Sequence, residues 1–296
     1  MFKFKVADIV MEYDCQHEEF FGHRLKNYMV DDDTPADMYL KYAVEERIEL
    51  PPHKVTSKVQ DAKLGVRTDN GNAIMYLQNP KSGRVISYTE NNQDYTYNVS
   101  KIVHIEPNKN SILTDCDREY LRSGGIFNNR LIIEGGTTLH GSCISYRGGG
   151  VIFSAPCGTG KSTHTGIWKK LFGDDVTFVN DDKPAIRFKG DVPYVYGAPW
   201  SGKTELNNNV SVPLKGIVFL GRGEENTIKR IGIAETVCYL NDQTFPSFHD
   251  KALFERNLDV IERIIETVPV YKLDCNMDNS AAILARDTIF GKVKGE

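Results

Sequence analysis

The stretch GVIFSAPCGTGKS, residues 150–162, decides the fold class of this chain. It begins with a short apolar run bounded by glycine, which is typical of a buried β-strand, and ends in Gly-Thr-Gly-Lys-Ser. Residues 162–171 read as a helix that stops at Gly173. A strand, a glycine-rich turn and a helix in this order predict a phosphate-binding loop, because backbone N–H groups of the turn and of the helix N-terminus converge on an anion.

The glycine-rich turn carries the residues that we expect to bind a nucleotide. In such a loop the lysine reaches the β- and γ-phosphates, and the hydroxyl that follows it is a Mg²⁺ ligand. Lys161 and Ser162 hold these positions, and a chance strand-to-helix turn is the alternative interpretation. The predicted nucleotide-binding residues are Cys157, Gly158, Thr159, Gly160, Lys161, Ser162 and Thr163.

A second stretch matches the same sequence pattern. Residues 197–204, GAPWSGKT, match the strict pattern G-x-x-x-x-G-K-[ST], whereas residues 155–162 have Ala155 in place of the first glycine. The sequence of residues 205–213 does not favour a helix. The second stretch therefore lacks the helix N-terminus that an anion site needs. We therefore assign nucleotide binding to the first stretch.

Two adjacent carboxylates follow the next apolar run. Residues 176–179 predict a buried strand that leads through Asn180 into Asp181 and Asp182. In a parallel sheet this strand would end at the same edge as the phosphate loop. One carboxylate can then bind Mg²⁺, while the other accepts the proton of an attacking hydroxyl. A solvated turn is the alternative.

The two parts of the chain have different periodicities. The first part is rich in alternating runs, and Asn70-Gly71 favours a tight hairpin turn. The second part alternates strands with helices, which is typical of an α/β layer structure. We expect a β-rich α+β domain over residues 1–125 and a phosphate-loop α/β domain over residues 126–296. Hairpins are predicted over 66–76 and 84–104, buried strands at 131–133 and 217–220, and a helix over 254–268 that Pro269 ends.

The composition excludes several classes of protein. The 296 residues include 36 Lys and Arg against 40 Asp and Glu, a net charge of −4 that gives no basic excess for nucleic acid or a membrane surface. The six cysteines lack the C-x-x-C spacing of a zinc site or a disulfide framework. We expect no signal peptide, because the first residues alternate like a strand, and no apolar run approaches the roughly 18–20 residues that span a bilayer. We expect a cytoplasmic protein that binds neither nucleic acid nor membranes.

These motifs resemble the catalytic domain of HPr kinase/phosphorylase, a bacterial serine kinase whose fold is shared with ATP-dependent phosphoenolpyruvate carboxykinase. The resemblance covers about residues 126–240. It rests on residues 139–141 (Leu-His-Gly), the strand and loop over 150–162, and Asn180-Asp181-Asp182. It implies a kinase core of that fold that uses ATP and Mg²⁺. Because HPr kinases form ring-like oligomers, it also implies a homo-oligomer.

The resemblance implies a role for each matched residue. His140, Lys161 and Asp182 would lie in the active site, with Asp182 as the general base toward the acceptor hydroxyl. Ser162 would bind magnesium, and Asp181 would complete the metal shell. From the residues alone, His140 is more typical of a packed or surface histidine.

The chain departs from the family at two places. Thr163 follows the loop serine where HPr kinases have glutamate, and residues 198–205 replace a signature that contains glycine and arginine. The replacement predicts a rigid lip over the acceptor, with Lys203 near the transferred phosphoryl group and Glu205 as a further metal ligand. A β-turn with Trp200 packed for stability is the alternative. Arg222 and Arg230 are weaker candidates for a transition-state arginine.

The function predicted from the sequence is an ATP- and Mg²⁺-dependent kinase that phosphorylates a hydroxyl, most simply a serine of a peptide or protein. A small-molecule kinase and a nucleotide-binding sensor or assembly factor without phosphotransfer remain as alternatives. A carboxykinase-like decarboxylase ranks last, because no set of arginines for a dicarboxylate is evident.

Overall fold

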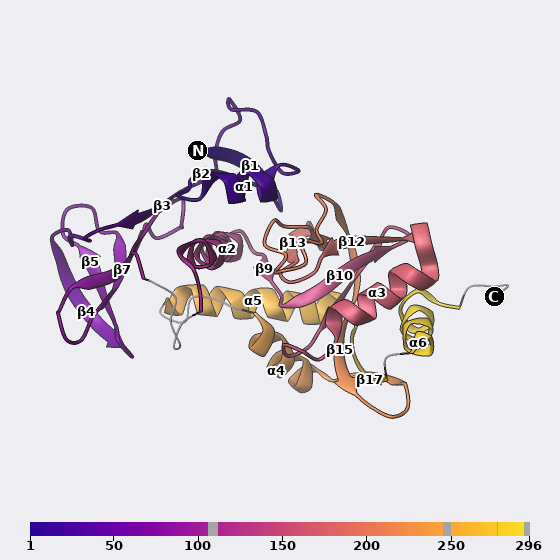
Figure 1. Cartoon of the computed structure of the whole chain (residues 1–296). Coiled ribbons are helices and arrows are strands. Elements are labelled where there is room, and N and C mark those ends of the chain that lie inside the picture. The colour runs from indigo at the N-terminus through magenta and orange to yellow at the C-terminus, as the bar shows by residue number, and fades with distance from the viewer. Residues whose placement is uncertain (106–111, 245–249, 277, 293–296) are drawn as a thin grey trace. The chain divides into compact units, whose positions relative to one another are not determined.

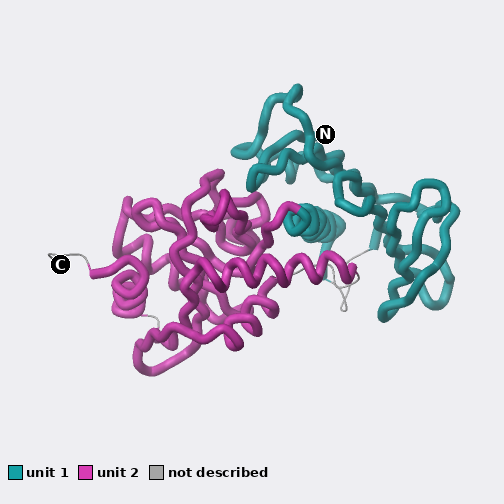
Figure 2. The backbone as a smooth tube through the Cα atoms, turned by 180° about the vertical axis from the view of Figure 1, so that it is seen from behind, with its two compact units in different colours: residues 1–133 teal, residues 134–296 magenta. Residues whose placement is uncertain are grey.

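The computed structural model describes residues 1–105, 112–244, 250–276 and 278–292, and the chain divides into two compact units (Figure 2). Unit 1 is Met1–Ile133 and unit 2 is Glu134–Glu296. The division falls eight residues after the expected one, because helix α2, Asp115–Ile133, belongs to unit 1 as a whole. The chain is of the mixed α/β class. Among the described residues, no helix has both the length and the apolar character needed to cross a membrane.

Unit 1 contains an eight-stranded sheet in the order β1-β2-β3-β8-β7-β6-β5-β4. The two predicted hairpins are confirmed: β5 pairs with β6, and β7 with β8, both antiparallel. Helix α1 spans Glu18–Leu25. The strands are β1 Phe2–Val6, β2 Ile9–Asp14, β3 Met38–Glu45, β4 His53–Val59, β5 Ala62–Arg67, β6 Ala73–Gln78, β7 Val85–Asn91 and β8 Tyr97–Val103.

The strand predicted at residues 131–133 is wrong. These residues form the last turn of α2, in which Phe127, Leu131 and Ile132 are buried at helical spacing. A short apolar run reads alike in a buried strand and in a buried helix, so periodicity over three residues could not separate the two.

Unit 2 contains a nine-stranded sheet, with the path β12-β10-β11-β15-β14-β13-β9 and with β17 added beside β15 and β16 beside β17. The predicted strands at 150–153, 176–179 and 217–220 are confirmed as parts of β11, β12 and β15. The strands are β9 Thr137–Thr138, β10 Gly141–Tyr146, β11 Gly149–Ser154, β12 Val176–Asn180, β13 Ala185–Lys189, β14 Val192–Tyr196, β15 Ser211–Arg222, β16 Thr227–Arg230 and β17 Val270–Cys275.

Helices cover both faces of the unit 2 sheet (Figure 1). Alternate residues of β11 point to opposite faces: Val151 and Phe153 pack with Trp168 of α3 and Ala281 of α6, whereas Ile152 packs on the side of α4 and α5. This three-layer packing explains why the central strands are apolar throughout. The helices are α3 Lys161–Phe172, α4 Ile233–Gln243, α5 Lys251–Thr267 and α6 Asn279–Phe290, with a 3₁₀ turn at Gly173–Asp175.

The strand directions bring the predicted motifs to one edge of the sheet. Strand β12 is antiparallel to β10, and β10 is antiparallel to β11, so β11 and β12 run in the same direction. Strands β15 and β17 are parallel to β11. The carboxyl ends of all four strands therefore lie at the edge where β11 leads into the glycine-rich turn, which is where open α/β sheets bind ligands.

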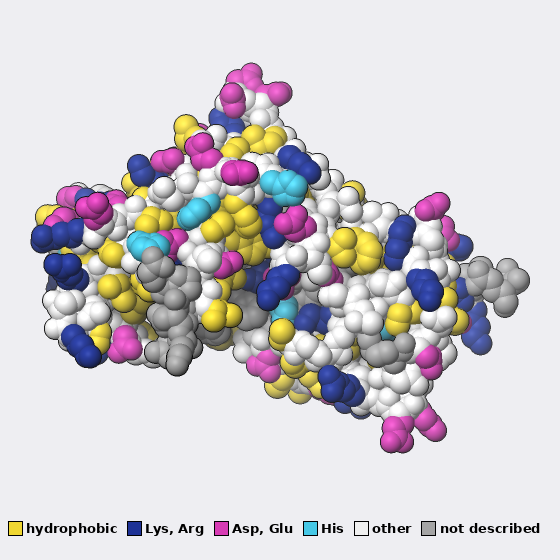
Figure 3. Space-filling view, viewed as in Figure 1, with side chains coloured by type: hydrophobic (Ala, Val, Ile, Leu, Met, Phe, Trp, Pro, Cys, Tyr) yellow, Lys and Arg dark blue, Asp and Glu magenta, His cyan; other side chains and the backbone are white. Residues whose placement is uncertain are grey.

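On the face shown in Figure 3, basic and acidic side chains are interspersed rather than gathered by sign. This distribution is what the nearly balanced composition predicts, and it presents no broad basic surface on that face.

Candidate active site

The first glycine-rich stretch connects a strand to a helix, in the order that the sequence predicted. Strand β11 ends at Ser154, α3 begins at Lys161, and the turn between them contains Gly158 and Gly160 at φ +78° and +107°. Such positive φ values favour glycine. No side chain caps the first turn of α3, so its N-terminal amides remain available to an anion.

Lys161 folds back onto this turn. Its Nζ atom donates to the carbonyl oxygen of Ala155 at 2.9 Å and to that of Pro156 at 3.4 Å, and the side chain is buried. Burial lowers the pKa of the ammonium group, while Cys157, Asp182 and Asp181 oppose that shift. A phosphate that entered the loop would give this buried cation a charged partner in place of neutral carbonyls.

Asp181 is held on both carboxylate oxygens. Its Oδ1 accepts from the hydroxyl of Ser142 at 2.5 Å, and its Oδ2 accepts from that of Thr204 at 2.8 Å. The Ser142 hydroxyl is also 2.8 Å from that of Thr165 on α3. The network ties the end of β12 to the helix that follows the loop. It fixes the position of Asp181 at the sheet edge.

Asp182 lies beside His140. The carboxylate is 3.7 Å from Nε2 of His140, and Nδ1 of His140 is 3.0 Å from the side-chain oxygen of Gln243. In the tautomer that this contact favours, Nδ1 carries the proton and Nε2 is an acceptor. Burial, and then the charge of Lys161, lower the pKa of His140, so the neutral ring is favoured near pH 7.

Asn180 aligns the two carboxylates with the second glycine-rich stretch. Its side-chain oxygen accepts from the backbone N–H of Asp182 at 2.8 Å and of Lys183 at 2.6 Å. Its amide donates to the carbonyl oxygens of Ala198 and Trp200. The fixed turn after β12 is the local reason that Asp181 and Asp182 point to different partners.

The second stretch, residues 197–204, joins β14 to β15 without a helix, as predicted. It nevertheless contributes to the site, because Thr204 bonds Asp181 and a Cβ on Gly202 would lie 3.1 Å from that of Asp182. Trp200 is buried, which agrees with the alternative in which this side chain packs for stability in a β-turn. Lys203 is exposed and forms no ion pair with the residues that the structure describes.

Two of the three predicted magnesium ligands are exposed side chains. Ser162 is exposed in the first turn of α3, Asp181 is engaged by two hydroxyls, and Glu205 is exposed on a turn at φ +55°. No group of three or more His, Cys, Asp or Glu side chains suited to a metal occurs among the described residues. Since Mg²⁺ beside a nucleotide needs only one or two protein ligands, Ser162 and Asp181 fit that ion, and Glu205 gains no support.

A cavity of about 460 Å³ lies on the other side of the loop. Arg222, at the end of β15, donates from Nη2 to the carbonyl oxygen of Gly158 at 3.3 Å and so borders both the loop and the cavity. Arg230 does not line it. The lining residues are Gly158, Thr159, Gly160, Leu220, Gly221, Arg222, Gly223, Cys275 and Asn276.

Sequence reasoning missed the residues that support the site. Ser142 and Gln243 bond Asp181 and His140, which are 39 and 103 positions away, and Thr165 bonds Ser142, which is 23 positions away. Their hydroxyl and amide side chains carry no motif of their own. Only the pairing of β10 with β11 and β12 brings Ser142 between the loop and Asp181.

Comparisons with known proteins give little further detail. No protein-family model matches the chain, and no curated protein sequence matches it. Among solved structures, the chain is similar to an Hpr(Ser) kinase/phosphatase from Coxiella burnetii, with a TM-score of 0.32 and 12% sequence identity. That match covers 51% of this chain and 95% of the other.

Proposed function

We propose that the protein is an ATP- and Mg²⁺-dependent phosphotransferase that phosphorylates a hydroxyl group, a serine of a peptide or protein being the first candidate. The observation that carries this proposal is the placement of the Asp182–His140 pair at the sheet edge where Lys161 and the uncapped N-terminus of α3 lie. One side of this arrangement suits the phosphates of a nucleotide. The other side has a carboxylate that can accept the proton of a hydroxyl group.

The loop side would hold the nucleotide. Backbone amides of the glycine-rich turn and of the first turn of α3 would bind the phosphates, and Lys161 would exchange its carbonyl partners for phosphate oxygens. Ser162, with Asp181 behind it, would hold Mg²⁺, which supplies electrostatic stabilisation of the charge on the phosphates. Arg222 is placed to add a cation beside Gly158.

The carboxylate side would hold the acceptor. Asp182 would accept the proton of the attacking hydroxyl, and the neutral His140 would lie beside that carboxylate on the acceptor side. A hydroxyl has one proton to donate, so it would donate to Asp182, and Nε2 of His140, 3.7 Å from that carboxylate, would remain an acceptor for another donor of the substrate. Lys203 stays a proposed cation for the transferred group, and Glu205 a proposed metal ligand.

The test is transfer of label from γ-labelled ATP, with Mg²⁺, to proteins and small molecules of a lysate from the source organism. Asp182→Asn is expected to lower transfer by at least about 100-fold while nucleotide affinity changes little, because it removes the base and not the phosphate contacts. Asp191→Asn, at an exposed position in the β13–β14 turn, is the matched control.

Full transfer by the Asp182→Asn protein would overturn the assignment of the base. Tight ATP binding by the wild type without any labelled product would favour the nucleotide-binding sensor instead. A labelled small molecule in place of a labelled protein would change the acceptor class and keep the phosphotransferase.

A further inference from the structure

Among the described residues, the sheet of unit 1 has a strand position, here called the lane, that stays open where β8 ends. Strand β8 pairs with β3 as far as Glu45–Val103, and its ladder with β7 begins at Ser87–Ile102. Beyond Val103 the chain leaves the sheet toward α2, where Arg118 donates to the carbonyl oxygen of Ile105 at 3.2 Å. The chain after β3 and the start of β7 therefore continue on either side of a position that no strand of the described residues fills.

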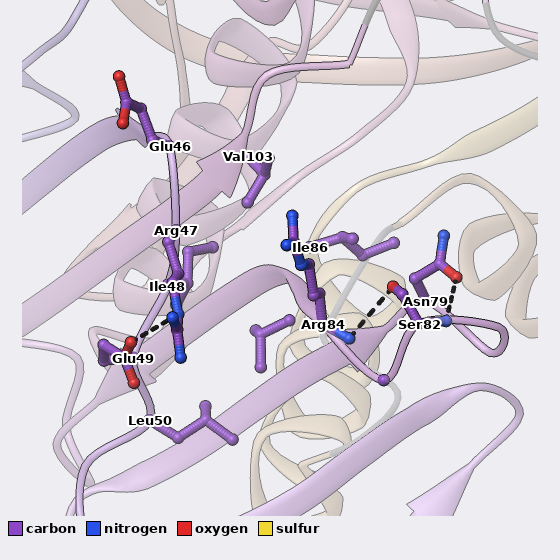
Figure 4. A pocket seen from close by; sticks show the side chains of 12 residues that line it. Glu46, Arg47, Ile48, Glu49, Leu50, Asn79, Ser82, Arg84, Ile86 and Val103 are labelled. Carbon is purple, nitrogen blue, oxygen red and sulfur yellow. Dashed lines mark hydrogen bonds and ion pairs between the residues drawn. The ribbon is translucent and has the colours of Figure 1, made fainter.

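A cavity of about 580 Å³ occupies this lane. Figure 4 shows residues 46–50, which continue from β3, along one side, the β6–β7 turn and the start of β7 along the other, and Val103 at one end. The lining residues are Glu46, Arg47, Ile48, Glu49, Leu50, Asn79, Ser82, Gly83, Arg84, Val85, Ile86 and Val103.

The side of the cavity formed by residues 47–50 offers main-chain hydrogen-bonding groups. These four residues form no backbone hydrogen bond with the part of the chain that the structure describes. Ile48 is nevertheless buried, with 4% of its surface exposed. Unpaired main-chain groups in an extended segment are a template for another strand, and they favour a ligand with a peptide backbone.

The floor of the cavity is apolar. Ile48 and Val85 are buried, and Leu50 and Val103 pack against the same cluster. Ile86 stands at an irregularity of the β6–β7 ladder, where Ser87 opposes Leu77 and Val85 opposes Gln78. An extra residue of this kind redirects its side chain, and here that residue is part of the cavity wall.

Among the described residues, the rim carries one unpaired charge of each sign, Glu46 after β3 and Arg84 before β7. Arg47 is paired with Glu49, whose carboxylate is 2.7 Å from its Nε. Arg84 forms no ion pair with any residue that the structure describes. A carboxylate on the ligand would therefore meet an unneutralised guanidinium at Arg84.

From these observations we infer that unit 1 binds an extended peptide segment in this lane, with β-branched or other apolar side chains on the floor and an acidic side chain at Arg84. The segment would pair with residues 47–50 as an added strand. The inference does not depend on the phosphotransferase activity, and it assigns unit 1 a recognition role of its own.

The test uses the full chain and an array of octapeptides that alternate valine with polar residues, with glutamate, glutamine or lysine at each polar position in turn. We expect glutamate peptides to bind at least tenfold more tightly than their lysine counterparts. Arg84→Glu should reverse that preference, and Lys81→Glu should leave it unchanged. Lys81 is an exposed cation in the same turn and outside the cavity, so it is the matched control.

Hydrogen exchange supplies the second readout. Amides of residues 47–50 should exchange more slowly when a glutamate peptide binds, and a proline at the pairing positions of that peptide should abolish the protection. Absence of binding, or binding that is insensitive to Arg84→Glu, would overturn the inference. Equal protection by octanoate, a small apolar carboxylate, would also overturn it and assign the cavity to small amphipathic anions.

Discussion

The two glycine-rich stretches of unit 2 have nearly the same spelling and different structures. Residues 155–162 connect β11 to α3, whereas residues 197–204 connect β14 to β15. At Gly158 nothing lies within 4 Å of the place where a Cβ would stand, and φ is +78°. At Gly197 an added Cβ would lie 1.8 Å from the carbonyl oxygen of Asn208 and 2.8 Å from that of Val179.

This difference shows that one residue type serves two purposes. The glycine of the first stretch leaves room where a ligand can approach the backbone, while that of the second stretch makes room for the protein's own backbone. The strict spelling of the second stretch therefore reflects close packing. Its remaining residues support the first, since Thr204 and Gly202 border the two carboxylates.

The largest expected effect separates the two lysines. Lys161→Ala should lower phosphotransfer by about 1,000-fold, because it removes the cation that the phosphate loop offers. Lys203→Ala should lower transfer by only about tenfold, because Lys203 is exposed and solvent screens the charge that it would place near the transferred phosphoryl group. For both variants, transfer of label from ATP measures the reaction, and titration with a fluorescent nucleotide measures nucleotide affinity. Equal losses in the two variants would mean that both stretches bind phosphate.

The next effect separates the two glycines by stability. Gly197→Ala should cost about 3 kcal/mol of the free energy of unfolding, because the backbone of Asn208 must move. Gly158→Ala should cost about 1–2 kcal/mol, the cost of a side chain at positive φ. Urea unfolding followed by tryptophan fluorescence is suited to this, because the only two tryptophans, Trp168 and Trp200, both lie in unit 2. A larger loss of stability in Gly158→Ala than in Gly197→Ala would contradict the difference between the two glycines.

A smaller effect is expected at the hydroxyl that connects the second stretch to the site. Thr204→Val removes one hydrogen bond to Asp181, worth about 1.5 kcal/mol for a charged acceptor, and should slow transfer about tenfold. ATP affinity should stay near that of the wild type. Thr227→Val, at an exposed position of β16, is the matched control. An unchanged transfer rate would show that Asp181 needs only Ser142.

The smallest effect concerns the helix that only the first stretch possesses. His164 of α3 is fully buried, which lowers its pKa to about 4, and its Nε2 accepts from the indole of Trp168. The unfolded chain binds a proton below about pH 6.5 and the folded chain does not, so stability falls as the pH drops toward 4. Between pH 7.5 and 5.5 the loss should be about 1 kcal/mol.

His164→Gln tests this assignment, because glutamine keeps an acceptor for Trp168 and does not titrate. The variant should lose less stability than the wild type over the same pH range, with unfolding again followed by tryptophan fluorescence. The same pH dependence in both proteins would assign the acid sensitivity to other groups.

The sequence predicted the elements whose signals are local. The hairpin around Asn70-Gly71, the strand before the first loop, the helix after it and the helix ended by Pro269 all depend on residues near one another along the chain. The strand predicted at 131–133 failed because three apolar residues do not define a period. The contact of Gln243 with His140 was not predictable, because it joins residues 103 positions apart.

By itself, the sequence determined which stretch is the phosphate-loop candidate and that Asp181 and Asp182 directly follow a buried strand. Turn and helix signals are carried by consecutive residues. Only the tertiary structure decided that Asp181 is held by Ser142 and Thr204 while Asp182 faces His140, and that β8 leaves a lane beside Arg84. Those features depend on strand order and register, which are set by packing between segments distant in the chain.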